Sequence, residues 1–116
     1  MIEKIRVMKF GGTSVGDATC IRRAAEIVAL AAHDGQLVVV VSAMSGVTNR
    51  LIKAAQASAT GDMRVPNELA EALRTQHHSA IAMLVNNDST REQLTVELDQ
   101  LIDEVADLCR GTALLR

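Results

Sequence analysis

The sequence is almost without aromatic residues. Among its 116 residues Phe10 is the single phenylalanine, and there is no Tyr or Trp. Positive charge is not in excess either, because 12 Lys and Arg face 14 Asp and Glu. Nucleic-acid binders use aromatic rings to stack bases and basic patches to hold phosphates, so we expect no nucleic-acid partner. The 48% of residues that are apolar predict a core of aliphatic side chains.

Long hydrophobic runs and cysteine motifs are also absent. No apolar run approaches the roughly 18 residues that cross a bilayer, and residues 1–4 lack the basic-then-apolar order of a secretion signal. We therefore expect no membrane partner and a cytoplasmic location. Cys20 and Cys109 lie far apart and outside any Cys/His cluster, which predicts no zinc site and favours two small core residues.

The first 41 residues predict a β-α-β unit. Residues 5–10 alternate and then meet Gly11-Gly12, which is typical of a strand ending in a turn. Asp17 is a suitable cap for a helix over about 18–32, where apolar residues keep helical spacing. Residues 37–41 are an unbroken aliphatic run, which predicts a strand covered on both faces in a parallel sheet.

The remainder predicts three helices. The first covers about 47–59, and we expect three apolar residues to face inward: Leu51, Ile52 and Ala55. Pro66 suits the first turn of the second, which covers 67–85. The third begins with a capping box at residues 89–92 and ends at Gly111. Its apolar stripe is Leu94, Leu98, Leu101, Val105 and Leu108.

Histidines and acids on these helices invite a metal or acid–base interpretation. His77 falls within the apolar stripe of the second helix, formed by Leu69, Leu73, Ala80 and Leu84, and His78 is its neighbour. Adjacent helical positions point in different directions, so we favour a partly buried histidine with one satisfied nitrogen. The acids of the last helix favour a solvated face over a metal site: Asp99, Asp103, Glu104 and Asp107. We expect no metal ligands.

The resulting β-α-β-α-α-α order predicts an α/β domain with helices packed on a parallel sheet. The chain length allows one core. Two strands cannot bury both faces and both edges of a sheet, and sheets usually have about 4 to 6 strands. We therefore expect further strands to come from elsewhere, so that residues 1–116 are a portion of a larger domain.

Glycines and a lysine mark the junction of the first strand and the first helix, in Lys9-Phe-Gly-Gly-Thr-Ser14. Ligands of parallel sheets bind outside the carboxyl ends of the strands, where this turn lies. Glycine lets the backbone approach a phosphate closely, and amides at a helix N-terminus attract anions. The lysine precedes the glycines, unlike that of a P-loop. Such a glycine pair alone is commonly just a turn.

The second strand also ends in small and hydroxylated residues, in the segment Ser42-Ala-Met-Ser-Gly-Val-Thr-Asn49. Carboxyl ends of parallel strands meet at one edge of the sheet, so we expect two polar loops to lie together there. Loops of this kind can hold a small ligand between backbone amides and hydroxyls. Met44 is equally consistent with lining that pocket and with simple packing.

Together, the two segments resemble a known family. Lys9-Phe-Gly-Gly-Thr-Ser-Val15 is similar to the opening signature of aspartate kinases, and residues 39–49 are similar to their second motif. The resemblance implies a three-layer parallel-sheet amino-acid kinase-like fold, of which only the N-terminal β-α-β-α-α-α portion is present. It also implies transfer of the ATP γ-phosphoryl group to the side-chain carboxylate of L-aspartate. The product, 4-phospho-L-aspartate, leads to lysine, threonine and methionine.

The resemblance also implies roles for individual residues. Lys9 is the expected catalytic residue, stabilising charge on the transferring phosphoryl group, and it binds ATP together with Phe10, Gly11 and Gly12. Three hydroxyl residues are expected to contact aspartate: Thr13, Ser42 and Thr48. ATP is the expected cofactor, with Mg2+ bound through the nucleotide. Lysine and amides are credible parts of such a site, because phosphoryl transfer needs positioning and charge neutralisation above all.

Other parts that the family implies are missing. They include a Gly-Glu motif, an arginine for the aspartate carboxylate, a catalytic aspartate, the adenine-binding strands and the regulatory ACT domains. We therefore expect an N-terminal fragment that does not catalyse alone, with the remainder of the kinase domain, or a second copy at its open strand edges, as partner. Two alternatives stay open: a non-catalytic interaction module, or another amino-acid kinase acting on a glutamate-like carboxylate.

Overall fold

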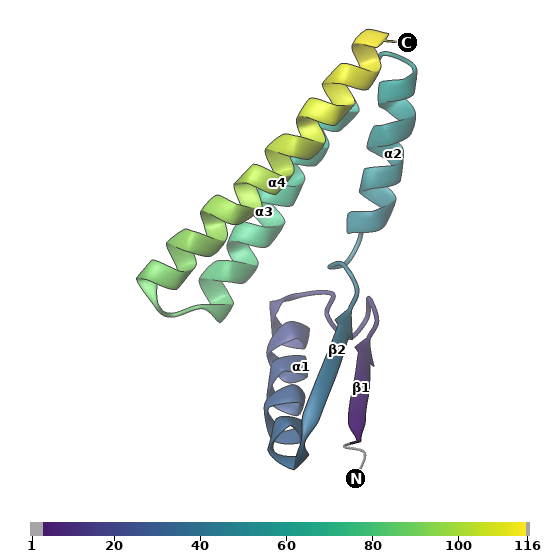
Figure 1. The fold of residues 1–116 in the computed structure, drawn as a ribbon. Coiled ribbons are helices and arrows are strands. Elements are labelled where there is room, and N and C mark those ends of the chain that lie inside the picture. Colours follow the sequence, from purple (N-terminus) through teal and green to yellow (C-terminus); the bar gives the residue numbers. More distant parts are fainter. Residues whose placement is uncertain (1–3, 116) are drawn as a thin grey trace. The chain divides into compact units, whose positions relative to one another are not determined.

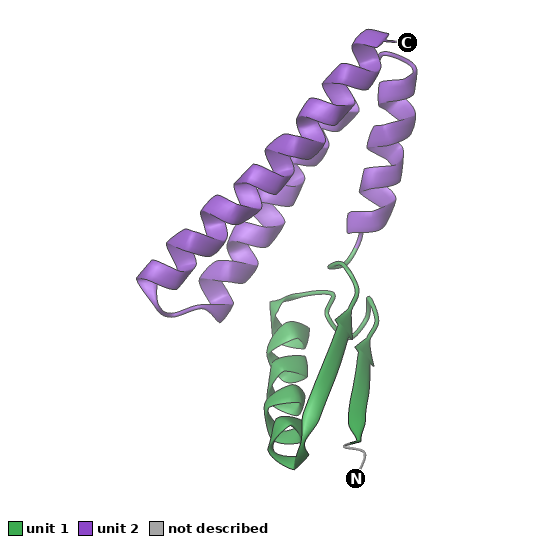
Figure 2. Cartoon of the chain, in the orientation of Figure 1, with its two compact units in different colours: residues 1–45 green, residues 46–116 purple. Residues whose placement is uncertain are grey.

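The computed structural model describes residues 4–115, and Figure 1 shows their fold. The elements are, in order, β1 (Ile5–Phe10), α1 (Ala18–Ala31), the 3-10 helix η1 (Ala32–Asp34), β2 (Gln36–Val41), α2 (Val47–Ala59), α3 (Arg64–Leu84) and α4 (Asp88–Leu115). The predicted β-α-β-α-α-α order is confirmed. Chain length favoured a single core, whereas the chain divides into two compact units, residues 1–45 and 46–116 (Figure 2).

The first unit is a parallel pair of strands with one helix along it (Figure 1). Register runs from Ile5 opposite Gln36 to Phe10 opposite Val41. Alternation places Met8 and Phe10, both half-buried, on the face that α1 covers. The other face carries four exposed apolar side chains: Ile5, Val7, Val38 and Val40. Among the described residues of this unit, the prediction that β2 is covered on both faces is therefore wrong, because α1 covers one face.

Helix α1 begins as its sequence predicts. Asp17 is its cap, and the side-chain oxygen Oδ1 accepts a hydrogen bond of 2.8 Å from the amide of Cys20. This bond is the main reason that the pKa of Asp17 lies below its ordinary value of 3.8, and the charge of Arg23 adds to it. At the far end the chain turns through Gly35 at φ 142°, a conformation that favours glycine.

Backbone hydrogen bonds tie the two loops at the carboxyl ends of the strands to each other. The amide of Ser42 donates to the carbonyl oxygen of Phe10 at 3.0 Å, and that of Ser45 donates to Gly16 at 3.0 Å. A Cβ at Gly16 would lie 2.8 Å from the carbonyl oxygen of Gly12, so the turn closes on itself too tightly for any side chain there. Gly16 is therefore required by packing.

The second unit is a three-helix assembly built on small residues and leucines. Buried in α2 are Val47, Ala54 and Ser58, whereas Leu51, Ile52 and Ala55 are exposed. The predicted inward face of α2 is therefore wrong. The small side chains at 54 and 58 let a neighbouring helix approach closely. The buried Ser58 hydroxyl donates to the Ala54 carbonyl oxygen at 2.7 Å, so this polar group has a hydrogen-bond partner within its own helix.

The inner face of α3 follows the predicted stripe, with Leu69, Leu73 and Ala80 buried and Leu84 half-buried. His77 is half-buried, and its Nδ1 lies 2.8 Å from the carbonyl oxygen of Leu73, which confirms a histidine with one satisfied nitrogen.

Ion pairs join α3 to α4. Arg74 pairs with Asp99 at 3.4 Å and with Asp103, and Asp99 also lies 2.8 Å from Nε2 of His78. The hydrogen bond to Asp103 is the main cause of the raised pKa of Arg74. Asp103, Glu104 and Asp107 are exposed, as expected of a solvated face, whereas Asp99 is half-buried beside Arg74 and His78, so the expectation is wrong for Asp99. Residues 4–115 contain no cluster of three or more His, Cys, Asp or Glu that could hold a metal ion.

Both predicted ends of the last helix differ from the structure. Helix α4 begins at Asp88, and its cap is Asn87, whose Oδ1 accepts from the amide of Thr90 at 2.9 Å. Ser89 is already inside the first turn, so the capping box is wrong. Gly111 lies within the helix, which continues to Leu115, because a single glycine costs a long helix only about 1 kcal/mol. Among the described residues no helix is long and apolar enough to cross a bilayer.

The buried side chain of Ile102 on α4 generates the first prediction. Ile102 is 4% exposed and Val96, on the same helix, is 51% exposed. We expect Ile102→Ala to lower the free energy of unfolding by about 2 to 5 kcal/mol, because removing the larger side chain leaves a cavity among packed neighbours. Val96→Ala should change it by less than about 0.5 kcal/mol. Urea unfolding followed by circular dichroism measures both. Equal effects would contradict the assigned packing of α4.

Two glycines of the first turn form a matched pair for the second prediction. A Cβ at Gly16 meets the backbone at 2.8 Å, whereas a Cβ at Gly11 meets nothing within 4 Å. Gly16→Ala should therefore displace the turn and lower the melting temperature, and Gly11→Ala should do neither. Amide chemical shifts of residues 10–16 and 42–45 report the displacement. A turn that accepts alanine equally at both positions would contradict this geometry.

Candidate functional site

The candidate site lies in the first unit, at the carboxyl ends of β1 and β2. It consists of the turn of residues 11–16, the end of β1 and the start of the loop that follows β2. The hydrogen bond between Ser42 and Phe10 continues the parallel pairing by one residue beyond the strands. The structure therefore brings together Lys9, Phe10, Gly11, Gly12, Thr13 and Ser42, all of which the sequence predicted for one site.

Lys9 is exposed on the sheet face that α1 leaves open. It pairs in register with Val40, and alternation puts its side chain on the opposite face from Met8 and Phe10. Within residues 4–115 its ammonium group forms no ion pair. An unpaired cation at the carboxyl end of a parallel strand is available to attract an anionic ligand.

Neither Gly11 nor Gly12 is explained by packing or by backbone conformation. A Cβ at Gly11 would meet nothing within 4 Å, and one at Gly12 would meet only the Oγ of Ser42, at an ordinary 3.7 Å. Positive φ angles occur among the described residues only at Gly35, Gly46 and Gly61. Space left bare above these two backbone positions is what close approach of a ligand requires.

Some backbone amides of the turn donate hydrogen bonds within the chain, and others do not. Those of Ser14 and Val15 donate to the carbonyl oxygen of Gly11, at 2.9 and 3.2 Å. Those of Gly12 and Thr13 donate to no residue of the described part of the chain. The first turn of α1 is occupied by its own Asp17 cap. The open amides of Gly12 and Thr13 belong to the turn, and the amide of Cys20 does not make the expected contribution of the helix N-terminus, because the Asp17 cap uses it.

Thr13 lies against a small pocket on the α1 side of the turn. The pocket has a volume of about 180 Å³, and its lining is Phe10, Thr13, Ser14, Cys20, Arg23, Ala24 and Ile27. Arg23 is a second cation close to the turn, and the sequence analysis did not single it out. Its only sequence signal is its place in the second turn of the helix that follows the glycines. Cys20, which lines the same pocket, is half-buried and free.

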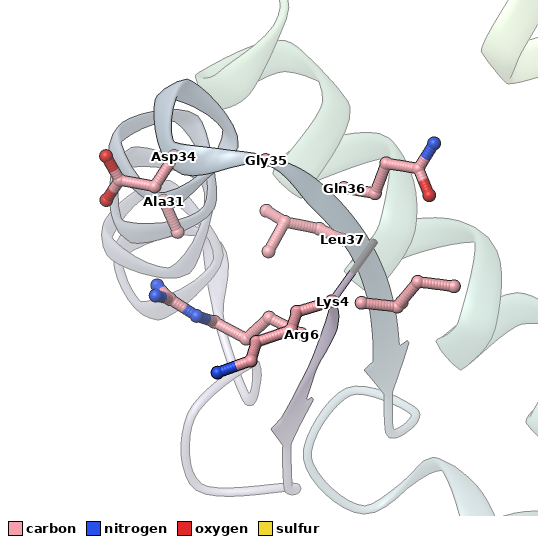
Figure 3. A pocket seen from close by; sticks show the side chains of 8 residues that line it. Lys4, Arg6, Ala31, Asp34, Gly35, Gln36 and Leu37 are labelled. Carbon is pink, nitrogen blue, oxygen red and sulfur yellow. The ribbon is translucent and has the colours of Figure 1, made fainter. Parts of the chain in front are cut away.

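Another pocket lies at the opposite ends of the same strands (Figure 3). It measures about 310 Å³, and its polar lining mixes both signs of charge: Lys4, Arg6, Asp34 and Gln36. Leu37 points toward α1 and Gln36 points away from it (Figure 3). Parallel sheets bind ligands at the carboxyl ends of their strands, and this pocket is at the amino ends. It therefore stays outside the candidate site.

Thr48 and Met44 complete the list of residues considered for the site. Met44 is half-buried in the loop after β2. Thr48 is exposed in the first turn of α2 and belongs to the second unit. Its predicted contact with the same ligand as Lys9 stays a prediction.

Comparison with known proteins places the chain among kinases of amino acids. The model of the amino acid kinase family matches residues 4–110. Aspartate kinase from Pseudomonas fluorescens is 46% identical over 79 residues, which are 67% of this chain and 19% of that protein. The Pseudomonas putida aspartate kinase is 48% identical over the same shares. Lysine-sensitive aspartokinase 3 from Escherichia coli is 32% identical over 113 residues, 97% of this chain and 23% of that protein.

These matches confirm the resemblance that the two motifs indicated. The chain spans about a fifth of the length of the curated relatives it matches. Within residues 4–115, the two parallel strands and four α-helices are compatible with part of an amino acid kinase fold, so the predicted fold class is confirmed as well. By sequence and by architecture, the chain belongs to the amino acid kinase family.

Proposed function

We propose that the paired loops of the first unit are the phosphate-binding half of an aspartate kinase active site. The reaction is transfer of the ATP γ-phosphoryl group to the side-chain carboxylate of L-aspartate, giving 4-phospho-L-aspartate. One observation carries the proposal: the amides of Gly12 and Thr13 are open at the strand end that also holds the unpaired Lys9. The aspartate kinases matched above support the choice of substrate.

The assigned roles follow the chemistry of each group. Lys9 neutralises charge that builds up on the transferring phosphoryl group, and bare backbone at Gly11 and Gly12 lets the phosphates approach the open amides. Phe10 belongs to the same ATP-phosphate turn, and its side chain lines the small pocket beside α1. Thr13, Ser42 and Thr48 are assigned to aspartate through their hydroxyl groups.

Magnesium would accompany the nucleotide rather than bind to this part of the chain. Hard cations require oxygen ligands, chiefly carboxylates and water. The turn offers amides, an ammonium group and the hydroxyl groups of Thr13 and Ser14, and its nearby carboxylate, Asp17, accepts from Cys20 through Oδ1. Residues 4–115 contain no cluster of carboxylates that could hold the ion. The residues present therefore fit the phosphates of ATP and do not fit the metal, so no step is assigned to a metal held by this chain.

The turn and the loop after β2 provide only part of such a site. Nothing in the turn or the β2 loop provides a cation for the carboxylates of aspartate or a surface for adenine. Positioning contributes about 7 to 11 kcal/mol to the lowering of a reaction barrier, so half a site should lose nearly all of its rate. We propose that the remainder of a kinase domain completes it. A cytoplasmic location and a biosynthetic role remain predictions.

A second candidate, a non-catalytic interaction module, is favoured by the open face of the sheet. Ile5, Val7, Val38 and Val40 are exposed together on that face. Such a face and the free strand edges could receive strands of another chain or of a second copy. The two candidates differ in one respect: a module needs the apolar face and has no use for Lys9.

The test is a chimera in which this chain replaces the matched segment of one of the Pseudomonas aspartate kinases. We expect formation of aspartyl phosphate, trapped as the hydroxamate, by the chimera and none by the isolated chain. Lys9→Ala in the chimera should lower kcat about 100-fold or more and change KM much less, because the charge acts mainly in the transition state.

Lys4→Ala is the matched control, because Lys4 is another exposed lysine beside β1 but lies at the opposite end of the sheet. It should leave kcat unchanged. Nearly normal kcat after Lys9→Ala would remove Lys9 from its role, and robust turnover by the isolated chain would overturn the proposal that the site is incomplete. A folded but inactive chimera would favour the interaction module.

A further inference from the structure

The small pocket between the turn of residues 11–16 and α1 is lined by polar groups that the fold itself does not use. Its volume is about 180 Å³, and its polar lining comes from Thr13, Ser14 and Arg23. No described residue forms a hydrogen bond or an ion pair with the Arg23 guanidinium or a hydrogen bond with the two hydroxyl groups. These donors are therefore available to a ligand.

One side of α1 brings Arg23 to this pocket. Cys20, Arg23 and Ile27 are spaced by three and four residues, and Ala24 lies beside them on the same side of the helix. All four line the pocket together with Phe10, so the guanidinium stands at the rim of an otherwise apolar lining on this side. The arginine is exposed, which leaves its donors accessible from solvent.

The formal charge of the pocket lining is positive. Arg23 is the one Arg, Lys, Asp or Glu among the seven lining residues. The carboxylate that senses it is Asp17, whose pKa is lowered mainly by the hydrogen bond from the Cys20 amide and also by the charge of Arg23. Asp17 and Arg23 nevertheless form no ion pair in the described part of the chain. Pairing with Asp17 therefore does not occupy the guanidinium.

Charge and size together define the class of ligand. Arginine presents its N–H donors as a planar fork, which matches the paired oxygens of a carboxylate or a phosphate. A water molecule takes up about 30 Å³, so the pocket has room for about six, whereas pockets for drug-sized ligands begin at about 300 Å³. The pocket can therefore hold one anionic group on a short stem, and it is too small for a nucleoside.

This pocket and Lys9 lie on opposite sides of the turn. Strand alternation puts the side chain of Lys9 on the sheet face opposite to that of Phe10, and Phe10 lines the pocket. An anionic group inside the pocket is therefore separate from the phosphoryl group assigned to Lys9. The turn has one cation on each side, and each requires its own ligand group.

We propose that the pocket is a second anion subsite of the turn, in which Arg23 and the hydroxyl groups of Thr13 and Ser14 hold one oxyanion of a substrate. The oxyanion is a carboxylate of the amino-acid substrate or a phosphate of the nucleotide, since the two share this chemistry. The identity of the substrates rests on the proposed function, whereas the existence of the subsite does not.

An NMR titration of the chain tests the subsite without requiring activity. Inorganic phosphate and L-aspartate are the probes, each added at constant ionic strength. We expect at least one of them to shift the Nε–H resonance of Arg23 and the amides of Thr13 and Ser14 until saturation, and the probe that does so identifies the oxyanion. Arg23→Gln should abolish the saturable shift. The absence of saturable shifts with both probes would overturn the proposal.

Arg22→Gln is the matched control. Arg22 is an exposed arginine on the same helix and does not line the pocket, so this variant should bind the probe as the wild-type chain does. Arg23→Lys keeps the charge and loses the planar fork, so it should retain only part of the affinity. Circular dichroism verifies α1 in each variant. Equal loss in Arg22→Gln and Arg23→Gln would mean that the general charge of α1 attracts the probe, which would overturn the proposal.

Kinetics of the chimera described above separate the two sources of the oxyanion. Arg23→Gln should raise KM about 10-fold or more for one substrate and change kcat much less, because a group held away from Lys9 is bound alike before and during transfer. The affected substrate is aspartate if the pocket holds a carboxylate, and ATP if it holds a phosphate.

The same measurements distinguish failure of the subsite from failure of the proposed function. Unchanged KM values for both substrates, or a loss confined to kcat, would overturn the subsite even where Lys9→Ala abolishes transfer. A folded but inactive chimera, with a saturable shift at Arg23 in the isolated chain, would remove the kinase reaction and support the anion subsite.

Discussion

The site depends on the parallel pairing of β1 and β2. Because the strands run in the same direction and in register, both of their carboxyl ends arrive at one edge of the sheet. The bond from the Ser42 amide to the Phe10 carbonyl oxygen extends that pairing into the loops, and the bond from Ser45 to Gly16 closes it. Without this pairing, the lysine, the glycines and the serine would be unrelated features of two separate loops.

Glycine has two different physical roles within six residues of this turn. Gly16 is needed because the chain folds onto the carbonyl oxygen of Gly12. Gly11 and Gly12 meet no such obstacle, and their backbone is left bare on the side of the open amides. Packing thus accounts for the third glycine and does not account for the first two, which is why we propose that a ligand approaches their backbone.

Much of the architecture could be predicted from the sequence because its signals are local. Alternation predicts the strand of residues 5–10, and capping chemistry predicts the cap at Asp17. Glycine placement predicts the bounds of α2. Burial could not be predicted in the same way. Leu51 and Ile52 appeared to face inward, but Ala54 and Ser58 do so, because the approach of neighbouring helices selects small residues. The ends of α4 were missed because Asn87 caps before Ser89 can and because a long helix tolerates Gly111.

For the site, the residue types and their order predicted six positions at one edge of the sheet, and the parallel pairing places the ends of both strands at that edge. The open amides could be found only from the structure, because the sequence does not reveal which amides a turn uses in hydrogen bonds. The position of Arg23 in the pocket beside Thr13 also came only from the structure. The most direct test is an amide NMR titration of the chain with ATP, with adenosine as control. The account predicts that ATP shifts the resonances of Gly11, Gly12, Thr13 and Ser42 and that adenosine does not. Unchanged resonances at these residues, or shifts confined to the pocket beside Lys4 and Gln36, would contradict it.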